Sequence, residues 1–175
     1  NAGVGGGGGI YNNGGSLTVI TSIFSSNHSG GTFSYGGAIA NRWAARLTVT
    51  NSTFSHNSAH FNGGGIGNVS STLTVTNSTF ASNSAGQGGG IVTESGTATV
   101  TNSTFSSNYA AASGGGIGNT NSTLTVTNST FAGNASNLHA GTAIASYQTA
   151  ANLAGNIFVS NNSDANCSGW FSDNG

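Results

Sequence analysis

Residues 63–83 read GGGIGNVSSTLTVTNSTFASN, and this stretch decides the fold. Leu73 and Val75 alternate with threonines, which is the period of two expected of a strand with one buried face. A second strand is expected at Ile66, and a third begins just before Phe80. Each strand would span about three to five residues, and the glycine and threonine content is unfavourable for a helix.

The same pattern recurs along the whole chain. Six copies of Phe-x-x-Asn, each preceded by Gly-Gly-x-Ile or a close variant, begin at phenylalanines spaced 30, 26, 25, 26 and 27 residues apart: Phe24, Phe54, Phe80, Phe105, Phe131 and Phe158. A period in the twenties is typical of a solenoid, in which each unit buries its apolar face by stacking on its neighbours. We therefore predict an all-β fold, a right-handed parallel β-helix of about six coils with three short strands per coil.

The repeats predict one domain over residues 1–175, built of six units of about 26 residues, with a less regular segment at 162–175. Asparagine is expected at the corners, because it tolerates left-handed backbone geometry and its amide both donates and accepts hydrogen bonds. We predict two asparagine ladders that run from coil to coil. One contains Asn51, Asn77, Asn102 and Asn128, and the other contains Asn27, Asn57, Asn83, Asn108, Asn134 and Asn161.

The composition excludes several functional classes. Only five of the 175 residues are charged and the net charge is −1, so no basic patch is available for nucleic acid. No apolar run is long enough for a membrane-spanning helix. Because the sequence is rich in glycine, lacks lysine and begins without methionine, we expect a secreted or cell-surface protein. The single cysteine, Cys167, cannot form an internal disulfide.

The pairing of the Gly36-Gly37-Ala38-Ile39 segment with Phe-x-x-Asn resembles the repeat of polymorphic outer-membrane proteins and related bacterial right-handed β-helix repeat proteins. The other copies carry Gly-Gly-Gly-Ile or a close variant, and the resemblance covers nearly the whole chain. The resemblance implies membership of the broad pectate-lyase-like group. This resemblance implies exported proteins that serve as adhesins, stalks or other structural elements.

Catalytic chemistry is not expected. β-Helices that cleave sugar chains need clustered carboxylates as acid and base or as calcium ligands. The acids of this chain are Glu94, Asp164 and Asp173, which fall in different coils or in the C-terminal segment. The four histidines share no column and lack acidic or cysteine partners, so we predict no metal site and no cofactor.

Two features depart from the plain repeat and are candidates for recognition. A longer segment in the second coil carries Tyr35, Arg42, Trp43 and Arg46, and aromatic and arginine side chains are frequent in sugar and protein contacts. The alternative is a loop that packs its own aromatics. The second feature is a double threonine array that resembles the Thr-x-Thr face of ice-binding proteins: Thr48, Thr74, Thr99, Thr125, Thr50, Thr76, Thr101 and Thr127.

Ten Asn-x-Ser/Thr sequons occur, and several coincide with the predicted ladders, where a glycan would not fit. The candidate glycosylation sites are Asn27, Asn68, Asn121, Asn161 and Asn166.

The ends of the predicted solenoid lack the lysine, proline or capping helix that commonly protect open strand edges. We therefore predict a non-catalytic extracellular solenoid that stacks head-to-tail on itself into a fibre or forms a rigid surface stalk. The alternatives are an adhesin or module that binds surface glycans or a host or cell-surface protein, and an ice-binding protein.

Overall fold

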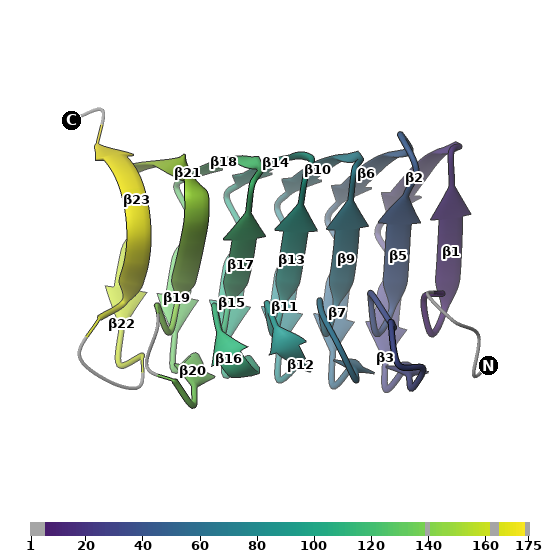
Figure 1. Ribbon diagram of the computed structural model, residues 1–175, viewed down its shortest axis with the longest axis horizontal. Helices are drawn as coiled ribbons and strands as arrows, with labels where there is room; N and C mark the ends of the chain where they lie inside the picture. Colours follow the sequence, from purple (N-terminus) through teal and green to yellow (C-terminus); the bar gives the residue numbers. More distant parts are fainter. Residues whose placement is uncertain (1–5, 139–140, 162–164, 174–175) are drawn as a thin grey trace.

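The computed structural model describes residues 6–138, 141–161 and 165–173. These residues form 23 β-strands and no helix. The strands stack in parallel into a rod, with β1 at one end and β23 at the other (Figure 1). The predicted all-β parallel solenoid of about six coils is confirmed.

The largest sheet covers two adjacent sides of the rod, which meet in the long strand β21 (Ile144–Ala154). The first side stacks β1 (Ile10–Asn13), β5 (Ile39–Arg42), β9 (Ile66–Val69), β13 (Ile91–Glu94) and β17 (Ile117–Thr120) onto the start of β21. The second side stacks β2 (Ser16–Ile20), β6 (Arg46–Thr50), β10 (Thr72–Thr76), β14 (Thr97–Thr101) and β18 (Thr123–Thr127) onto its end.

Two narrower sheets complete the coil. One stacks β3 (Ile23–Ser25), β7 (Thr53–Ser55), β11 (Thr79–Ala81), β15 (Thr104–Ser106), β19 (Thr130–Ala132) and β22 (Ile157–Val159). The other stacks β4 (His28–Ser29), β8 (Ser58–Ala59), β12 (Ser84–Gln87), β16 (Tyr109–Ser113) and β20 (Ala135–Ser136). A complete coil thus has four strands where three were predicted. The strand that follows Phe-x-x-Asn has two residues in three of the coils, which is too short to produce a hydrophobic period in the sequence, and four or five in two others.

The core consists of columns of similar apolar side chains, one residue per coil. Phenylalanines of neighbouring coils stack with ring centroids 4.8–5.3 Å apart, close to the strand spacing. Leucine, valine and isoleucine form parallel columns beside them, represented by Leu73, Val75 and Ile66, which are fully buried. The alternation in the TLTVT segments therefore places every second side chain in the core.

The asparagines of Phe-x-x-Asn form a continuous buried ladder. Each amide Nδ2 donates to the Oδ1 of the asparagine in the next coil at 2.9–3.0 Å, from Asn27 to Asn161. The same Oδ1 atoms accept a backbone N–H from the preceding coil. Asn57, Asn83, Asn108 and Asn134 are fully buried. Their amides thereby satisfy backbone groups at a corner that no strand pairing reaches.

The other predicted asparagine ladder is wrong. Asn51, Asn77, Asn102 and Asn128 are exposed and occupy the left-handed region at φ 50–52°. The serine that follows each of them is buried instead and forms the ladder: its Oγ accepts the backbone N–H of the preceding coil at 3.1–3.2 Å. The asparagine therefore provides the turn, and the smaller serine fits inside.

A third polar ladder lies at another corner and was not predicted. Asn12 donates to Asn41, Asn41 donates to Asn68, and Asn68 donates to the Thr93 hydroxyl, at 2.7–2.8 Å. Asn41 and Asn68 are fully buried. The mixed residue types in this column concealed it in the sequence.

The expected less regular segment includes residues 162–164 and 174–175, which lie outside the described part of the chain. Its remaining residues continue the largest sheet, because β23 (Cys167–Asp173) pairs with β21, with a register shift between Ser146 and Ala151. Cys167 packs on the core, and burial raises the pKa of its thiol to about 11.

Candidate binding groove

A groove runs along one side of the rod between two ladders of outward-facing residues. One wall is formed by the last residues of neighbouring strands in the first side of the largest sheet: Arg42, Val69, Glu94, Thr120 and, on β21, Tyr147. The opposite wall is a ladder of residues that precede the glycine corners: Tyr35, Asn62, Gln87 and Ser113. The hollow between them measures about 550 Å³ and continues into a second hollow of about 360 Å³.

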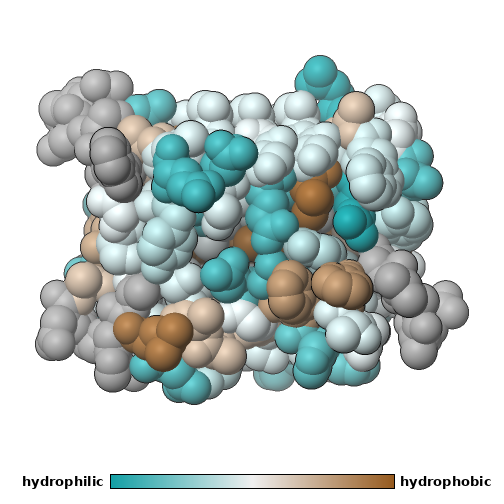
Figure 2. Space-filling view, viewed as in Figure 1, coloured by the Kyte–Doolittle hydropathy of each residue, from teal (hydrophilic) through white to brown (hydrophobic). Residues whose placement is uncertain are grey.

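Figure 2 shows this face, on which hydrophilic and hydrophobic side chains lie side by side in the hollow. The first hollow is lined by Tyr35, Phe61, Asn62, Gln87, Glu94 and Thr120, with small residues from β12 and β16. The second is lined in part by Leu138, Tyr147 and Gln148. Aromatic, amide and hydroxyl groups thus face the same space across several coils.

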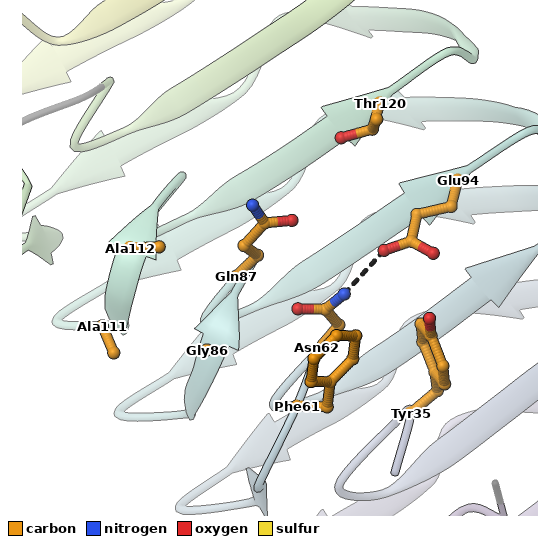
Figure 3. A pocket seen from close by; sticks show the side chains of 9 residues that line it. All are labelled: Tyr35, Phe61, Asn62, Gly86, Gln87, Glu94, Ala111, Ala112 and Thr120. Atoms are coloured by element: carbon orange, nitrogen blue, oxygen red, sulfur yellow. Dashed lines mark hydrogen bonds between the residues drawn. The ribbon is translucent and has the colours of Figure 1, made fainter. Parts of the chain in front are cut away.

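Glu94 is the centre of a polar cluster in the groove (Figure 3). The Asn62 amide donates to its Oε1 at 2.6 Å. The Tyr35 hydroxyl also donates to Glu94, and Tyr35 interacts with Asn62. Burial, followed by the negative charge of Glu94 and this hydrogen bond, raises the pKa of Tyr35 to about 12. The Tyr35 phenol therefore stays protonated and fixed against the carboxylate.

An aromatic cluster lies beside this polar one. Phe61 packs edge-on against Tyr35 with ring centroids 5.7 Å apart, and against Phe33 at 6.2 Å. The Arg42 guanidinium lies 4.8 Å from the Tyr35 ring centroid and 5.3 Å from that of Trp43. Phe61 remains 40% exposed, so part of its ring is available to a ligand.

The structure brings together three of the four predicted recognition residues, namely Tyr35, Arg42 and Trp43. Arg46 does not join them, because it begins β6 on the adjacent side of the rod and is exposed there. The alternative, a loop that packs its own aromatics, also agrees with the structure, because Phe61 packs on Phe33 and Tyr35.

Sequence reasoning missed Asn62, Gln87 and Glu94, which complete the groove. The long 30-residue spacing between Phe24 and Phe54 marks the coil that departs from the repeat. Aligning the repeats on their isoleucines would have placed Glu94 in one column with Arg42, three positions after each isoleucine. The segments before the glycine corners show no such periodicity in their sequence.

Glu94 is the carboxylate of the described groove lining, so the acid pair needed for sugar cleavage is not assembled there. Asp164 lies outside the described residues. In the part of the chain that the structure describes, no group of three histidine, cysteine or acidic residues is placed to hold a metal ion. What the geometry offers is binding by shape, aromatic faces and hydrogen bonds.

The candidate glycosylation sites fall into different environments. Asn68 is wrong as a candidate, because its side chain is fully buried and its Nδ2 donates to Thr93 and to two backbone carbonyls. Asn27 and Asn161 are half-buried at the ends of the asparagine ladder. Asn121 and Asn166 are exposed. The sequon asparagines of the wrongly predicted ladder, such as Asn77, are exposed as well. Their place in that ladder therefore does not exclude glycosylation.

The threonine array lies in register on the second side of the largest sheet. Thr48, Thr74, Thr99 and Thr125 pair in sequence, as do Thr50, Thr76, Thr101 and Thr127. The Thr101 and Thr127 hydroxyls lie 3.1 Å apart. Arg46, Ile20 and Ala154 interrupt the threonine surface at its margins. Ice binding by this surface stays a prediction.

No helix long and apolar enough to cross a membrane is found among the described residues. Comparison with curated proteins and with solved structures gave no match. Residues 6–175 match the family described as the right-handed β-helix region. The handedness expected from the crossover rule agrees with this family. Together with the stacked parallel coils, the match shows that the chain belongs to the right-handed β-helix family.

Proposed function

We propose that this chain is a non-catalytic extracellular rod that binds a glycan in its lateral groove, in the manner of an adhesin module. The observation that carries the proposal is the groove itself, in which Phe61, Tyr35 and Tyr147 offer ring surfaces beside the amides of Asn62 and Gln87. Sugar rings pack on aromatic faces, and their hydroxyls pair with amides and carboxylates. A groove along the rod axis also suits an extended polymer.

The rod supports this function by holding the groove rigidly. Every wall residue belongs to a column whose neighbours are hydrogen-bonded along the axis, so the two walls keep a fixed separation. Preorganisation of this kind reduces the entropy lost on binding. The same stack of columns suits a structural stalk that holds a binding site away from a surface.

The proposal is tested by affinity electrophoresis of the purified chain in gels that contain single soluble polysaccharides. Phe61→Ala removes a groove ring and is expected to weaken binding at least about tenfold. Tyr109→Ala is the matched control, because Tyr109 is 39% exposed on β16 but does not line the groove. The proposal would be overturned if no neutral or acidic polysaccharide retarded the wild type. It would also be overturned if both variants lost the same affinity.

A second candidate function is end-to-end assembly into a fibre, and it is favoured by a change of residue type at both ends of one column. The column holds threonine in the four middle coils but isoleucine at Ile23 on β3 and Ile157 on β22. These isoleucines are 78% and 58% exposed. Isoleucine in place of threonine at both ends of the column suits a contact with a neighbouring molecule.

Negative-stain electron microscopy across a concentration series tests this assembly. The expected result is filaments whose number falls in the Ile23→Thr and Ile157→Thr variants, which restore the residue of the middle coils. Both variants keep Ile20, an exposed isoleucine on β2, so that only the residues of the isoleucine–threonine column change. Single short rods at every concentration would count against end-to-end contact and leave the groove proposal unaffected.

A further inference from the structure

We infer that Trp43 forms an aromatic subsite at the end of the groove, on which one further ring of a sugar chain stacks. The inference rests on the glycan-binding function proposed above and adds a preference for long sugar chains over short ones. It follows from an inserted residue, from the backbone strain of the insertion and from the exposure of its side chain.

The corner that follows β5 contains one residue more than the same corner of the other coils. Two residues of positive φ, Trp43 at 62° and Ala44 at 59°, lie where each of the other coils has one. The single residues are Gly14, Ser70, Ser95, Asn121 and Gln148. The strands before and after the corner keep the common register, since β5 pairs with β9 and β6 pairs with β10 without a shift. The extra residue is therefore an insertion into one coil of a constant repeat.

The backbone of this insertion is strained. Left-handed geometry is unfavourable for tryptophan and for alanine, and here the two residues adopt it in succession. A single serine, such as Ser70, makes the same corner in the next coil, so the fold does not require the insertion. Strain that persists without a need of the fold is typical of binding and catalytic sites.

The insertion places an exposed indole ring at the end of the groove. Tyr35 lines the first hollow, and the Arg42 guanidinium lies 4.8 Å from the Tyr35 ring centroid and 5.3 Å from that of Trp43. This guanidinium connects the groove lining to the indole and orients the ring. Trp43 is 60% exposed, and its neighbours at the same corner of the adjacent coils, Gly14 and Ser70, are too small to cover it.

An exposed indole suits the apolar face of a sugar ring. Tryptophan offers a large apolar surface together with one N–H donor, so it can stack on a sugar and bind a hydroxyl. A chain that occupies the first hollow contacts Phe61 and Tyr35, and only a chain that extends past Tyr35 reaches Trp43. The subsite therefore adds affinity for long chains and none for chains that fill the hollow alone.

The experiment uses oligosaccharides graded by length, prepared by partial hydrolysis of the soluble polysaccharide that retards the wild-type chain most strongly. Their dissociation constants are measured by isothermal titration calorimetry. Deletion of Trp43 restores the corner of the other coils, Trp43→Ala keeps the insertion without its ring, and Trp43→Tyr keeps an aromatic ring. Circular dichroism checks that each variant is folded, and Trp43→Ala provides the test if the deletion does not fold.

The affinity of the wild type should rise with chain length up to the length that reaches Trp43. For these long oligosaccharides, the deletion and Trp43→Ala should weaken binding at least about tenfold, whereas Trp43→Tyr should retain most of the affinity. The shortest oligosaccharides should bind the wild type and all the variants equally, because the lining of the hollow is unchanged.

Two results would overturn the inference. One is an affinity of Trp43→Ala equal to that of the wild type at every length. The other is a loss as large for the shortest oligosaccharides as for the longest, because that pattern indicates a structural role of Trp43. In both cases the glycan-binding function would stand on the effect of Phe61→Ala, whereas binding of no polysaccharide by the wild type would overturn that function itself.

Discussion

One buried asparagine side chain in each of the middle coils makes four hydrogen bonds at once. Asn83 accepts the backbone N–H and the amide of Asn57, and it donates to the Phe54 carbonyl and to Asn108. No smaller side chain can replace this set, and a buried polar group without its partner costs free energy. The exposed asparagine of the same coil, Asn77, has only a conformational role at φ 51°.

These two roles predict opposite mutational outcomes. Asn83→Ala should lower the free energy of unfolding by about 3 to 5 kcal/mol, because it leaves several buried groups unpaired. Asn77→Ala should cost about 1 kcal/mol, the penalty of left-handed geometry without a glycine or asparagine. Chemical denaturation followed by circular dichroism measures both. Similar midpoint shifts in the two variants would contradict the distinction.

A pH dependence follows from Tyr35, whose pKa rises from the ordinary 10.0 to about 12. The folded protein then holds the phenolic proton more tightly than the unfolded chain. The resulting stabilisation is present below pH 10 and is lost as the pH rises from about 10 to about 12. Ultraviolet titration of phenolate should show one late component that disappears in Tyr35→Phe and moves to lower pH in Glu94→Gln. A phenol at this position that titrates near 10 would refute the assignment.

Among the elements, the glycine corners restrict the chain most severely. Gly88 adopts φ +60°, and an added Cβ would lie 2.2 Å from the Ile91 carbonyl oxygen. Gly90, two residues later, has an ordinary φ, and the equivalent positions of other coils carry Ala38 and Ala143, both buried. The corner therefore has one position that demands glycine and one that accepts alanine.

Gly88→Ala should destabilise the protein by about 3 kcal/mol or more, since both the backbone conformation and a backbone contact oppose it. Gly90→Ala should cost about 1 to 2 kcal/mol, because the nearby Phe105 ring and a carbonyl must shift slightly. The midpoints of thermal unfolding of the two variants provide the test. An equal loss would show that crowding, and not backbone geometry, limits the corner.

The strands were easier to predict than the corners. The Leu73 and Val75 alternation and the phenylalanine spacing predicted three strands of each coil, because burial imposes a period on residue type. The ladder at Asn51 was misassigned, since exposure at a corner depends on which of two adjacent polar residues turns inward. The groove was predicted only in part. Glu94 and Tyr35 are 59 residues apart in the sequence and meet only because their coils stack.

For the whole molecule, the coils form a one-dimensional stack in which each pairs mainly with its neighbours. Deleting residues 77–101 removes one complete repeat and joins Thr76 to Asn102, the equivalent of Asn77. The shortened chain should fold into a rod about 4.8 Å shorter with lower stability. Small-angle scattering and circular dichroism measure both properties. Deletion of about half a repeat is the control, because it breaks the register of the columns and should prevent folding.

The asparagine ladder also gives the rod an electrical direction. Each amide from Asn27 to Asn134 donates one N–H toward the β23 end, and each amide oxygen from Asn57 to Asn161 accepts from the β1 side. The second N–H of the amides from Asn57 onward donates to a phenylalanine carbonyl of the preceding coil. Dipoles aligned in this way add along the axis, as peptide dipoles do in a helix. In a chain with only five charged residues, few fixed charges mask this sum. The rod should therefore orient in an applied electric field, and antiparallel neighbours should attract each other side by side.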